Sequence, residues 1–351
     1  MATSMETKDL AFALKLAQPC LVSVEFIQVL SHYCFDGQFV YGYDNISAIV
    51  VECPTDLNCA VRGDTFLGLV GLAGEKTTLT QNKDSLEVVS GTSKTVLPIL
   101  PPERFILQLP EEPVFVEFAL PEDFLKGLAF CSLSVGNDPR RPEFTGITLR
   151  LGPTAVLYAS DDTVLTKFSL QKGLGRKVRE IILPKSVCDQ IQGVAAALEA
   201  KAEDVTVQVL TSHIVVSFNT SPAVTIIGQL TEAKPADFED TIKSCATTNP
   251  KVEMPEGFDS AVAKVILMLA KGVDRKCTLH TKGKALWVHG EGPMGRTETK
   301  FDVRTSLPDV TVNCSPDHLT TIMPYATHLV TDTKAVQLLG ERVEFYAASK
   351  G

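Results

Sequence analysis

A helix followed by an alternating hairpin recurs along the 351 residues, and this recurrence constrains the fold more than any other feature. The segments that begin at Thr7, Pro121 and Pro255 each resemble the start of an amphipathic helix, with acidic residues in the first turn. Alternating apolar residues around a turn follow each helix, which is the pattern of a β-hairpin. The three segments lie about one domain length apart, so the sequence predicts three similar domains.

Within each third the pattern runs twice, as helix, strands, helix and strands. The first hairpins are expected to turn at Asp36–Gly37, Gly152–Pro153 and Lys282–Gly283. A second helix signal then begins at Arg62, Pro184 and Ser315, and another alternating hairpin follows it. The chain therefore reads as six similar half-units.

Proline-bearing joints mark the expected boundaries, one at residues 98–113 and one at 247–255. We predict domains at residues 1–113, 114–250 and 251–351. The predicted fold class is α+β, with two helices packed on antiparallel sheets in each domain. The alternative is three unrelated α+β domains that share only a generic pattern.

Composition excludes several classes of protein. The chain is 44% hydrophobic and 21% charged, and no apolar run approaches the roughly 18 residues that a membrane span needs. Glu6 and Asp9 stand where a signal peptide would be basic, so we expect a cytoplasmic protein. The nine cysteines are odd in number and none is at CxxC spacing, which favours buried thiols over disulfides or zinc. No metal and no cofactor is expected.

Repeated modules suggest rotational symmetry, and therefore a closed ring with helices lining one face. A ring around nucleic acid needs positive charge on those helices; the net charge of −9 does not say where basic residues lie. Candidate helix lysines are Lys8, Lys15, Lys126, Lys264 and Lys271, and a glycine-bearing basic segment, expected to be a flexible loop, adds Lys172, Arg176, Lys177 and Arg179 before Lys185. The alternative for each is an ordinary solvated side chain.

Four segments carry a resemblance to a known family. Arg141–Leu149 resembles an R-P-x-L-x-G-V strand entry, Ser160–Leu165 stands at a T-D-G-H-R-L position, and Ile182–Lys185 resembles a V-P-R/K helix start. Leu86–Lys94 resembles L-x-I-x-S-G-R-S-R. The family is the beta subunit of bacterial DNA polymerase III, the sliding clamp. Each motif is weak alone, but their succession in order over essentially the whole chain is specific.

The resemblance implies the DNA clamp fold and a head-to-tail homodimeric ring. Such a ring encircles double-stranded DNA without reading its sequence, and it tethers DNA polymerase and the clamp loader as a processivity factor without catalysis. Domain one would meet domain three of the partner subunit through Thr95 and Leu97 on one side and Met268 and Leu269 on the other. Thr95 replaces a usual aromatic residue, which weakens the expected ring closure, and ordinary helix core is the alternative for Met268 and Leu269.

The resemblance also implies a hydrophobic pocket that takes short linear peptides from these partners. Its positions in this chain are Phe144, Ser160, Leu165, Ala236, Thr241, Phe345, Ala347 and Ala348. The chain departs from the family because Asp162–Val164 replaces Gly-His-Arg and Asp240 replaces an arginine. We expect a shallower, more acidic pocket, as would suit a clamp encoded by a bacteriophage and acting in the host cytoplasm.

Enzyme motifs are missing from the sequence. The six histidines show no HExxH spacing, and neither a GxSxG elbow nor a Walker A motif occurs. Asp161 and Asp162 could form a carboxylate pair, but adjacent residues at a strand end more often serve a turn. We predict no enzyme activity. Two alternatives stay open, a monomeric clamp-fold adaptor for replication proteins and an enzyme whose site assembles only in three dimensions.

Overall fold

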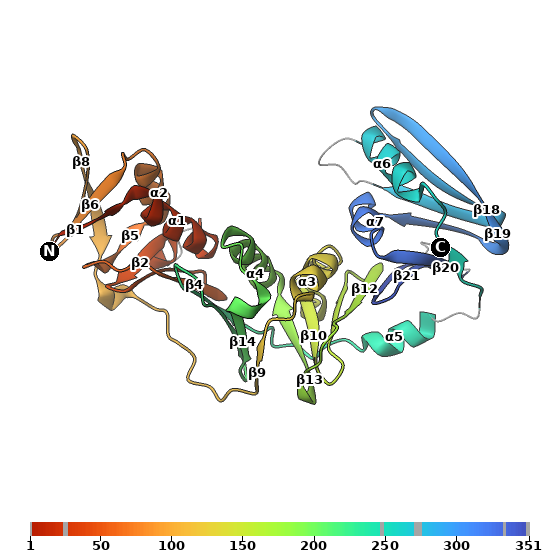
Figure 1. The fold of residues 1–351 in the computed structure, drawn as a ribbon, viewed down its shortest axis with the longest axis horizontal. Helices are drawn as coiled ribbons and strands as arrows, with labels where there is room; N and C mark the ends of the chain where they lie inside the picture. The colour runs from red at the N-terminus through yellow and green to blue at the C-terminus, as the bar shows by residue number, and fades with distance from the viewer. Residues whose placement is uncertain (1, 24–26, 246–248, 270–275, 333–334, 349–351) are drawn as a thin grey trace. The chain divides into compact units, whose positions relative to one another are not determined.

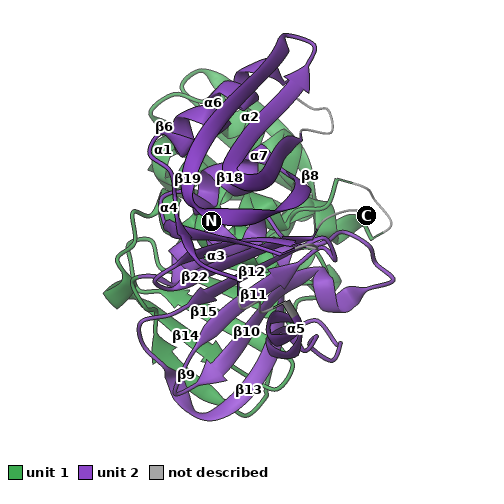
Figure 2. Ribbon diagram, turned by 90° about the vertical axis from the view of Figure 1, so that its right-hand side faces the viewer, with its two compact units in different colours: residues 1–122, 186–230 green, residues 123–185, 231–351 purple. Residues whose placement is uncertain are grey.

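A computed structural model of the chain describes residues 2–23, 27–245, 249–269, 276–332 and 335–348. These form two compact units, coloured separately in Figure 2: unit 1 holds residues 1–122 and 186–230, and unit 2 holds 123–185 and 231–351. The predicted middle domain contributes to both units, and the three-domain division stays a prediction. Neighbouring strands run antiparallel in all the described sheets, which confirms the predicted α+β class.

Unit 1 is built on one twelve-stranded sheet (Figure 1). Its strand order is β1-β6-β7-β8-β5-β2-β3-β4-β16-β15-β14-β9. The strands are β1 (Ala2–Glu6), β2 (His32–Asp36), β3 (Phe39–Tyr43), β4 (Ser47–Glu52), β5 (Asn58–Arg62), β6 (Lys76–Gln81), β7 (Ser85–Ser90), β8 (Ser93–Leu100), β9 (Val116–Ala119), β14 (Val205–Val209), β15 (His213–Phe218) and β16 (Val224–Gln229).

Three helices pack on this sheet: α1 (Thr7–Ala17), α2 (Gly63–Gly71) and α4 (Lys185–Ala197). Helix α1 buries Leu10 and Leu14 completely, at the spacing that places both on one helical face, and it packs on β3 and β4. Helix α4 approaches β16 at Gly228, where an added Cβ would lie 2.7 Å from a methyl group of Val187. Only glycine allows this close approach of helix and strand.

Unit 2 contains an eight-stranded sheet in the order β13-β10-β11-β12-β22-β21-β20-β17, together with a separate hairpin. The sheet strands are β10 (Gly146–Gly152), β11 (Val156–Ser160), β12 (Val164–Ser169), β13 (Leu174–Pro184), β17 (Val252–Glu253), β20 (Ala326–Thr331), β21 (Ala335–Gly340) and β22 (Val343–Ala348). The hairpin is β18 (Cys277–Gly292) and β19 (Gly295–Cys314).

The helices of unit 2 are α3 (Phe124–Ser132), α5 (Phe238–Cys245), α6 (Phe258–Met268) and α7 (Pro316–Ile322). Helix α3 packs on β10, β11 and β12, while α6 packs on the hairpin and on α7. At Gly290 an added Cβ would lie 2.2 Å from a methyl group of Val265 on α6, so this helix also meets its strand at a glycine. Helix α5 was not anticipated from the sequence.

The six predicted helix starts are all confirmed, and so are the turns at Asp36–Gly37 and Gly152–Pro153. The turn predicted at Lys282–Gly283 is wrong, because β18 continues through it and the hairpin reverses between Gly292 and Gly295. Gly283 instead has a φ of +57° at a point where the strand register shifts. A glycine inside a strand pattern marked a bulge, and the sequence interpretation took it for a turn.

The basic segment predicted as a flexible loop is also different in the structure. From Leu174 onward it is strand β13, which pairs with β10 across a register shift at Leu151/Gly152. Gly173 serves close packing, since a Cβ there would lie 2.4 Å from the Pro153 carbonyl oxygen, whereas Gly175 has a φ of +93°. Glycine thus allowed two backbones to meet here, and it did not make the segment a loop.

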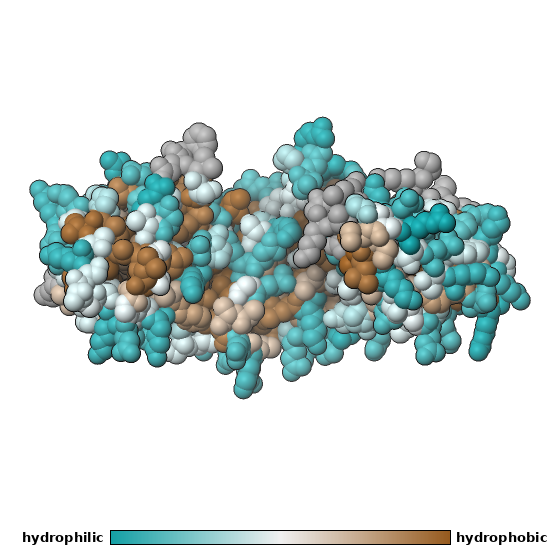
Figure 3. Space-filling view, turned by 90° about the horizontal axis from the view of Figure 1, so that it is seen from above, coloured by the Kyte–Doolittle hydropathy of each residue, from teal (hydrophilic) through white to brown (hydrophobic). Residues whose placement is uncertain are grey.

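Hydrophilic side chains project from most of the face shown in Figure 3, with hydrophobic residues gathered between them. Among the described residues, large apolar side chains that are mostly exposed include Leu72, Leu109, Leu267 and Met294. No described helix combines the length and apolar character needed to cross a bilayer.

The cysteines that the structure describes are free and buried, and burial raises the pKa of the Cys59 thiol to about 12. The Cys245 side chain lies outside the described part. Within that part no group of three His, Cys, Asp or Glu side chains could hold a metal ion.

Candidate functional site

An apolar pocket of about 320 Å³ opens in unit 2 where β12 and β22 lie beside α5. Its walls come from four places: the segment before β10, the β11–β12 turn with the start of β12, α5 with the residues just before it, and the β21–β22 pair. The lining residues are Arg141, Phe144, Ser160, Asp162, Thr163, Val164, Leu165, Ala236, Phe238, Thr241, Ile242, Ala335, Tyr346, Ala347 and Ala348.

Helix α5 forms one wall of the pocket and is held to the sheet by an aromatic stack. The Phe238 ring lies parallel to the Tyr158 ring on β11, with centroids 5.3 Å apart and planes 7° apart. Phe238 is 5% exposed, and Ile242, one turn later on the same face, also lines the pocket. Both side chains supply apolar surface to this wall.

A lysine between two glutamates fastens the same helix to the sheet. The Lys167 Nζ lies 3.4 Å from Glu239 on α5 and 3.1 Å from Glu344 on β22, and the side chain is only 15% exposed. Tyr158 donates its hydroxyl hydrogen to Glu239. This hydrogen bond, and then the nearby ammonium, hold the pKa of Glu239 below its ordinary value, so the carboxylate is ionised at neutral pH.

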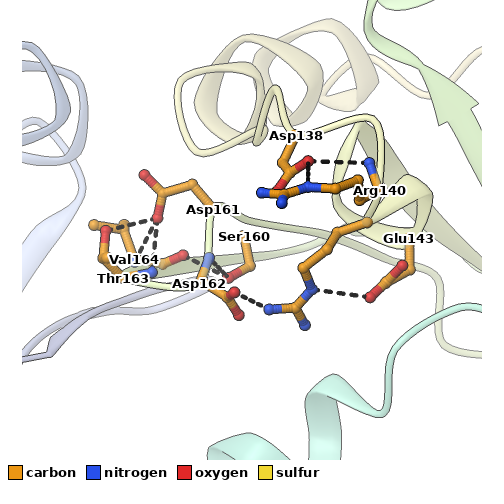
Figure 4. Close-up of polar contacts among 9 residues, drawn as sticks. Asp138, Arg140, Glu143, Ser160, Asp161, Asp162, Thr163 and Val164 are labelled. Carbon is orange, nitrogen blue, oxygen red and sulfur yellow. Dashed lines mark hydrogen bonds and ion pairs between the residues drawn. The ribbon is translucent and has the colours of Figure 1, made fainter.

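The opposite lip is the β11–β12 turn, whose polar contacts are drawn in Figure 4. Asp161 accepts hydrogen bonds from the backbone N–H groups of Thr163 and Val164, at 2.9 and 2.8 Å, which is the behaviour of a turn-forming aspartate. Asp162 adopts a left-handed conformation, with a φ of +78°. Ser160 donates its hydroxyl hydrogen to the Val164 carbonyl, at 2.8 Å, and closes the turn. Both residues therefore serve a turn, Asp161 through its carboxylate and Asp162 through its backbone, as the second of the two interpretations anticipated.

Arg141 sits at the rim between the turn and the segment before β10. Its guanidinium carbon lies 4.3 Å from the centre of the Phe144 ring, a cation–π geometry. The same group donates to Glu143 at 3.2 Å and to Asp162. The positive charge at the pocket entrance is therefore shared by two carboxylates.

The structure brings together almost every residue that the resemblance assigned to a peptide pocket. The ones that line it are Phe144, Ser160, Leu165, Ala236, Thr241, Ala347 and Ala348. Phe345 does not line it, because side chains alternate along a strand and Phe345 points to the opposite face of β22. There it is 1% exposed and lies against the His318 ring, while its neighbour Tyr346 faces the pocket.

The sequence interpretation named Thr241 but missed the helix that carries it and the pocket residues Phe238 and Ile242, although a local signal was present. Asp237 caps the helix by accepting a hydrogen bond from the Asp240 backbone N–H at 2.9 Å. Apolar residues follow at Phe238 and Ile242, the i and i+4 spacing of one helical face. An aspartate followed by this spacing predicts a short helix with one apolar side.

The candidate DNA-facing residues are almost all on the surface. Lys8 and Lys15 on α1, Lys126 on α3, Lys185 at the start of α4 and Lys264 on α6 are exposed, as are Lys172, Arg176 and Lys177. Arg179 on β13 is half-buried, and Lys271 lies outside the described residues. Their arrangement around a common axis stays a prediction.

The candidate subunit-interface residues lie on different elements. Leu97 on β8 is buried at 8% exposure and pairs with Leu86, while Thr95 is half-buried. Met268 and Leu269, at the end of α6, are half-buried, and the Met268 carbonyl accepts a hydrogen bond from the Met294 N–H at 3.4 Å. More accessible neighbours are Val96, at 55% exposure, and Leu267, at 69%. Their role in subunit contact stays a prediction.

The whole chain is similar to solved structures, although no protein-family model and no curated protein matches its sequence. The DNA polymerase III beta subunit of Pseudomonas aeruginosa matches over 100% of both chains, with a TM-score of 0.81 and 15% identity. A putative beta subunit from Eubacterium rectale matches with a TM-score of 0.84 and 11% identity, over 99% of this chain and 98% of its own. The chain has the fold of a bacterial sliding clamp.

Another structure with this clamp fold is the Helicobacter pylori beta clamp bound to a DNA ligase peptide. It matches over 100% of both chains, with a TM-score of 0.79 and 13% identity. The clamp fold predicted from the succession of motifs is therefore confirmed, while identities this low establish the fold alone.

Proposed function

We propose that this protein is a sliding clamp that encloses double-stranded DNA and tethers replication enzymes to it, without catalysing a reaction itself. The observation that carries the proposal is the match to clamp structures over the full length of both chains. A ring that works by enclosure needs an intact architecture more than any single side chain. It can therefore keep its function while most of its sequence changes.

The second support is the pocket between β12, β22 and α5. Its lining is mostly apolar, its volume of about 320 Å³ suits a few side chains of a short peptide, and its charged groups, Arg141 and Asp162, stand at the rim. The Helicobacter pylori clamp is known with a peptide bound. We infer that DNA polymerase and the clamp loader dock here through short linear segments.

Contacts with DNA would be made by the exposed lysines of α1, α3, α4 and α6 and by the basic residues of β13. Such contacts touch phosphates and carry no sequence information, so binding would be independent of sequence. We assign three domains, at residues 1–113, 114–250 and 251–351, and a head-to-tail homodimer in the cytoplasm. A strictly monomeric species in sedimentation at micromolar concentration would instead favour a clamp-fold adaptor.

Topological retention on DNA tests the proposal directly. The protein is first loaded onto nicked circular DNA by a clamp loader. Half of the sample is then linearised, and both halves are gel-filtered at moderate salt, which weakens phosphate contacts. We expect protein to travel with the circle, and to be released when a restriction enzyme then cuts that circle. Equal retention on both DNA forms contradicts enclosure.

The pocket is tested separately. Ala348 is exposed at the pocket lip, so a tryptophan there should fill the entrance without disturbing the core. Ala348→Trp is expected to abolish binding of partner peptides and to leave retention on circular DNA unchanged. Ala326→Trp, a half-buried position on β20 that does not line the pocket, is the matched control.

A further inference from the structure

We infer that the pocket selects partner segments in which a positively charged residue flanks the apolar residues. This inference rests on the proposed function, because it concerns the peptides that the pocket accepts. It rests on the numbers of positively and negatively charged side chains around the pocket.

The two cations that border the pocket most closely, Arg141 and Lys167, are already neutralised within the protein. Arg141 pairs with Asp162 and Glu143 at the rim. Lys167 pairs with Glu239 and Glu344 beneath α5, and at 15% exposure it has little surface to offer a ligand. Each cation therefore faces two carboxylates, and neither leaves unpaired positive charge at the entrance.

Further carboxylates flank the lining residues. Asp161 adjoins Asp162 in the turn, and Asp237 and Asp240 adjoin the lining residues of α5. Within the described part of the chain, no lysine or arginine lies within ion-pair distance of these three aspartates. Asp237 and Asp240 are exposed, and Asp161 is engaged only with N–H and hydroxyl groups of its own turn. Two further cations lie nearby: Arg150 acts on Glu239, and Lys243 on α5 is exposed beside the lining residue Ile242. Around the pocket, seven carboxylates thus stand against four cations: Glu143, Asp161, Asp162, Asp237, Glu239, Asp240 and Glu344 against Arg141, Arg150, Lys167 and Lys243.

This arrangement fixes the chemistry of a suitable occupant. The apolar interior, with Leu165, Phe238 and Tyr346 among its walls, takes aliphatic or aromatic side chains and offers nothing to a charge. A charged residue of the peptide must stay at the rim, where the surrounding field is negative. A lysine or arginine beside the apolar residues is therefore attracted, and an aspartate or glutamate is repelled.

Three fluorescein-labelled peptides test this selectivity, Gly-X-Leu-Thr-Leu-Phe-Gly with X as Lys, Gln or Glu. Their affinities for the full-length protein are measured by fluorescence anisotropy at low and high salt. We expect the order Lys above Gln above Glu, with a step of about two- to fivefold for each change, the range of exposed ion pairs. The differences should shrink at high salt because exposed charges are screened.

Two charge-reversal variants test which surface of the protein gives rise to the selectivity. Asp240→Lys reverses an exposed charge on α5 and is expected to remove or invert the preference between the Lys and Glu peptides, while affinity for the Gln peptide changes little. Glu298→Lys, an equivalent reversal at an exposed position on β19, is the matched control and should leave the order unchanged. Ala348→Trp should abolish binding of all three peptides.

The outcomes separate the two proposals. Equal affinities, or tightest binding of the Glu peptide, overturn the charge selectivity and leave the clamp function standing. An affinity order that Asp240→Lys leaves unchanged also overturns the charge selectivity. Failure of all three peptides to bind, or binding that Ala348→Trp does not affect, counts against the pocket as a partner site and therefore against both proposals.

Discussion

Two strand pairings join distant parts of this chain, and they differ in what they leave open. In unit 1, β4 pairs with β16 through apolar and small residues, including Ile49 opposite Ile226, both 0% exposed. In unit 2, β12 pairs with β22 and places Lys167 opposite Glu344. We call the β4–β16 pairing the sealed joint, because apolar side chains pack across it. We call the β12–β22 pairing the open joint, because it borders the pocket and is held partly by charge.

The difference shows how one kind of connection can serve either stability or binding. Apolar side chains that interlock on a sheet contribute stability in proportion to the area they remove from water. At the second joint, some of that area faces the pocket, and α5 covers only part of it. The apolar surface left uncovered there is what a partner segment could bury.

The largest expected effect is a truncation inside the sealed joint. Ile226→Ala should lower the free energy of unfolding by about 2–5 kcal/mol, because it leaves a cavity that close packing cannot refill. Leu165→Ala, at 6% exposure beside the pocket, is the comparison; it should cost less stability, since Leu165 already faces unfilled space, and should weaken peptide binding. Urea unfolding of both variants measures this. A greater loss from Leu165→Ala would refute the distinction between the joints.

A second test asks how tightly helix α4 closes over the sealed joint. Gly228→Ala should lower the free energy of unfolding by about 1–3 kcal/mol, because the new methyl group would lie 2.7 Å from Val187. Gly193→Ala on the same helix meets nothing within 4 Å and should raise stability by about 0.5–1 kcal/mol through helix propensity. Thermal unfolding should show a lower Tm for Gly228→Ala and a higher Tm for Gly193→Ala. An unchanged Tm for Gly228→Ala would mean that Val187 can move to accommodate the methyl group.

Sequence reasoning reached the repeated fold more completely than the site. Helix starts such as Thr7 and Pro316 carry local signals, acidic first turns or a proline, that act within a few residues and survive in one sequence. The turn predicted at Gly283 was wrong because glycine is common both in turns and in β-bulges. Only the pairing with the partner strand distinguishes the two.

The site depended on contacts that no local pattern encodes. Tyr158 and Phe238 are far apart in the chain, yet they stack and place α5 against the sheet. The choice between Phe345 and Tyr346 depends on which face of β22 the pocket occupies, and a shift of one residue along a strand reverses every side chain. The family resemblance gave the approximate positions of the pocket residues, and the strand register of β22 shows that Tyr346, and not Phe345, lines the pocket.

A third test removes the cation from the open joint. Lys167→Met should lower the free energy of unfolding by about 1–2 kcal/mol, because Glu239 and Glu344 lose the charge that lies between them. It should also weaken peptide binding, since α5 is a wall of the pocket. Lys300→Met is the control, because its pair with Asp302 is largely exposed and should change stability by less than about 0.5 kcal/mol. Equal effects of the two variants, measured by urea unfolding, would show that Lys167 does not fasten α5.

The smallest expected effect is on pH dependence. The pKa of Glu239 lies below its ordinary value of 4.5, so the folded state favours the ionised carboxylate. Its stabilising contribution is therefore fully present above pH 4.5 and is lost as the pH falls through the lowered pKa. Affinity for the Gln peptide should decrease over that window, by less than about fivefold because Glu239 is partly exposed.

Glu239→Gln is the control for this acid dependence, because the amide cannot titrate. The variant should bind the Gln peptide more weakly than the wild type at pH 7, and its affinity should change less between pH 7 and pH 4. An identical pH profile in both proteins would assign the acid sensitivity to other carboxylates. The open joint would then owe its closure to the Tyr158–Phe238 stack, and the contrast with the sealed joint would be one of pocket volume and not of charge.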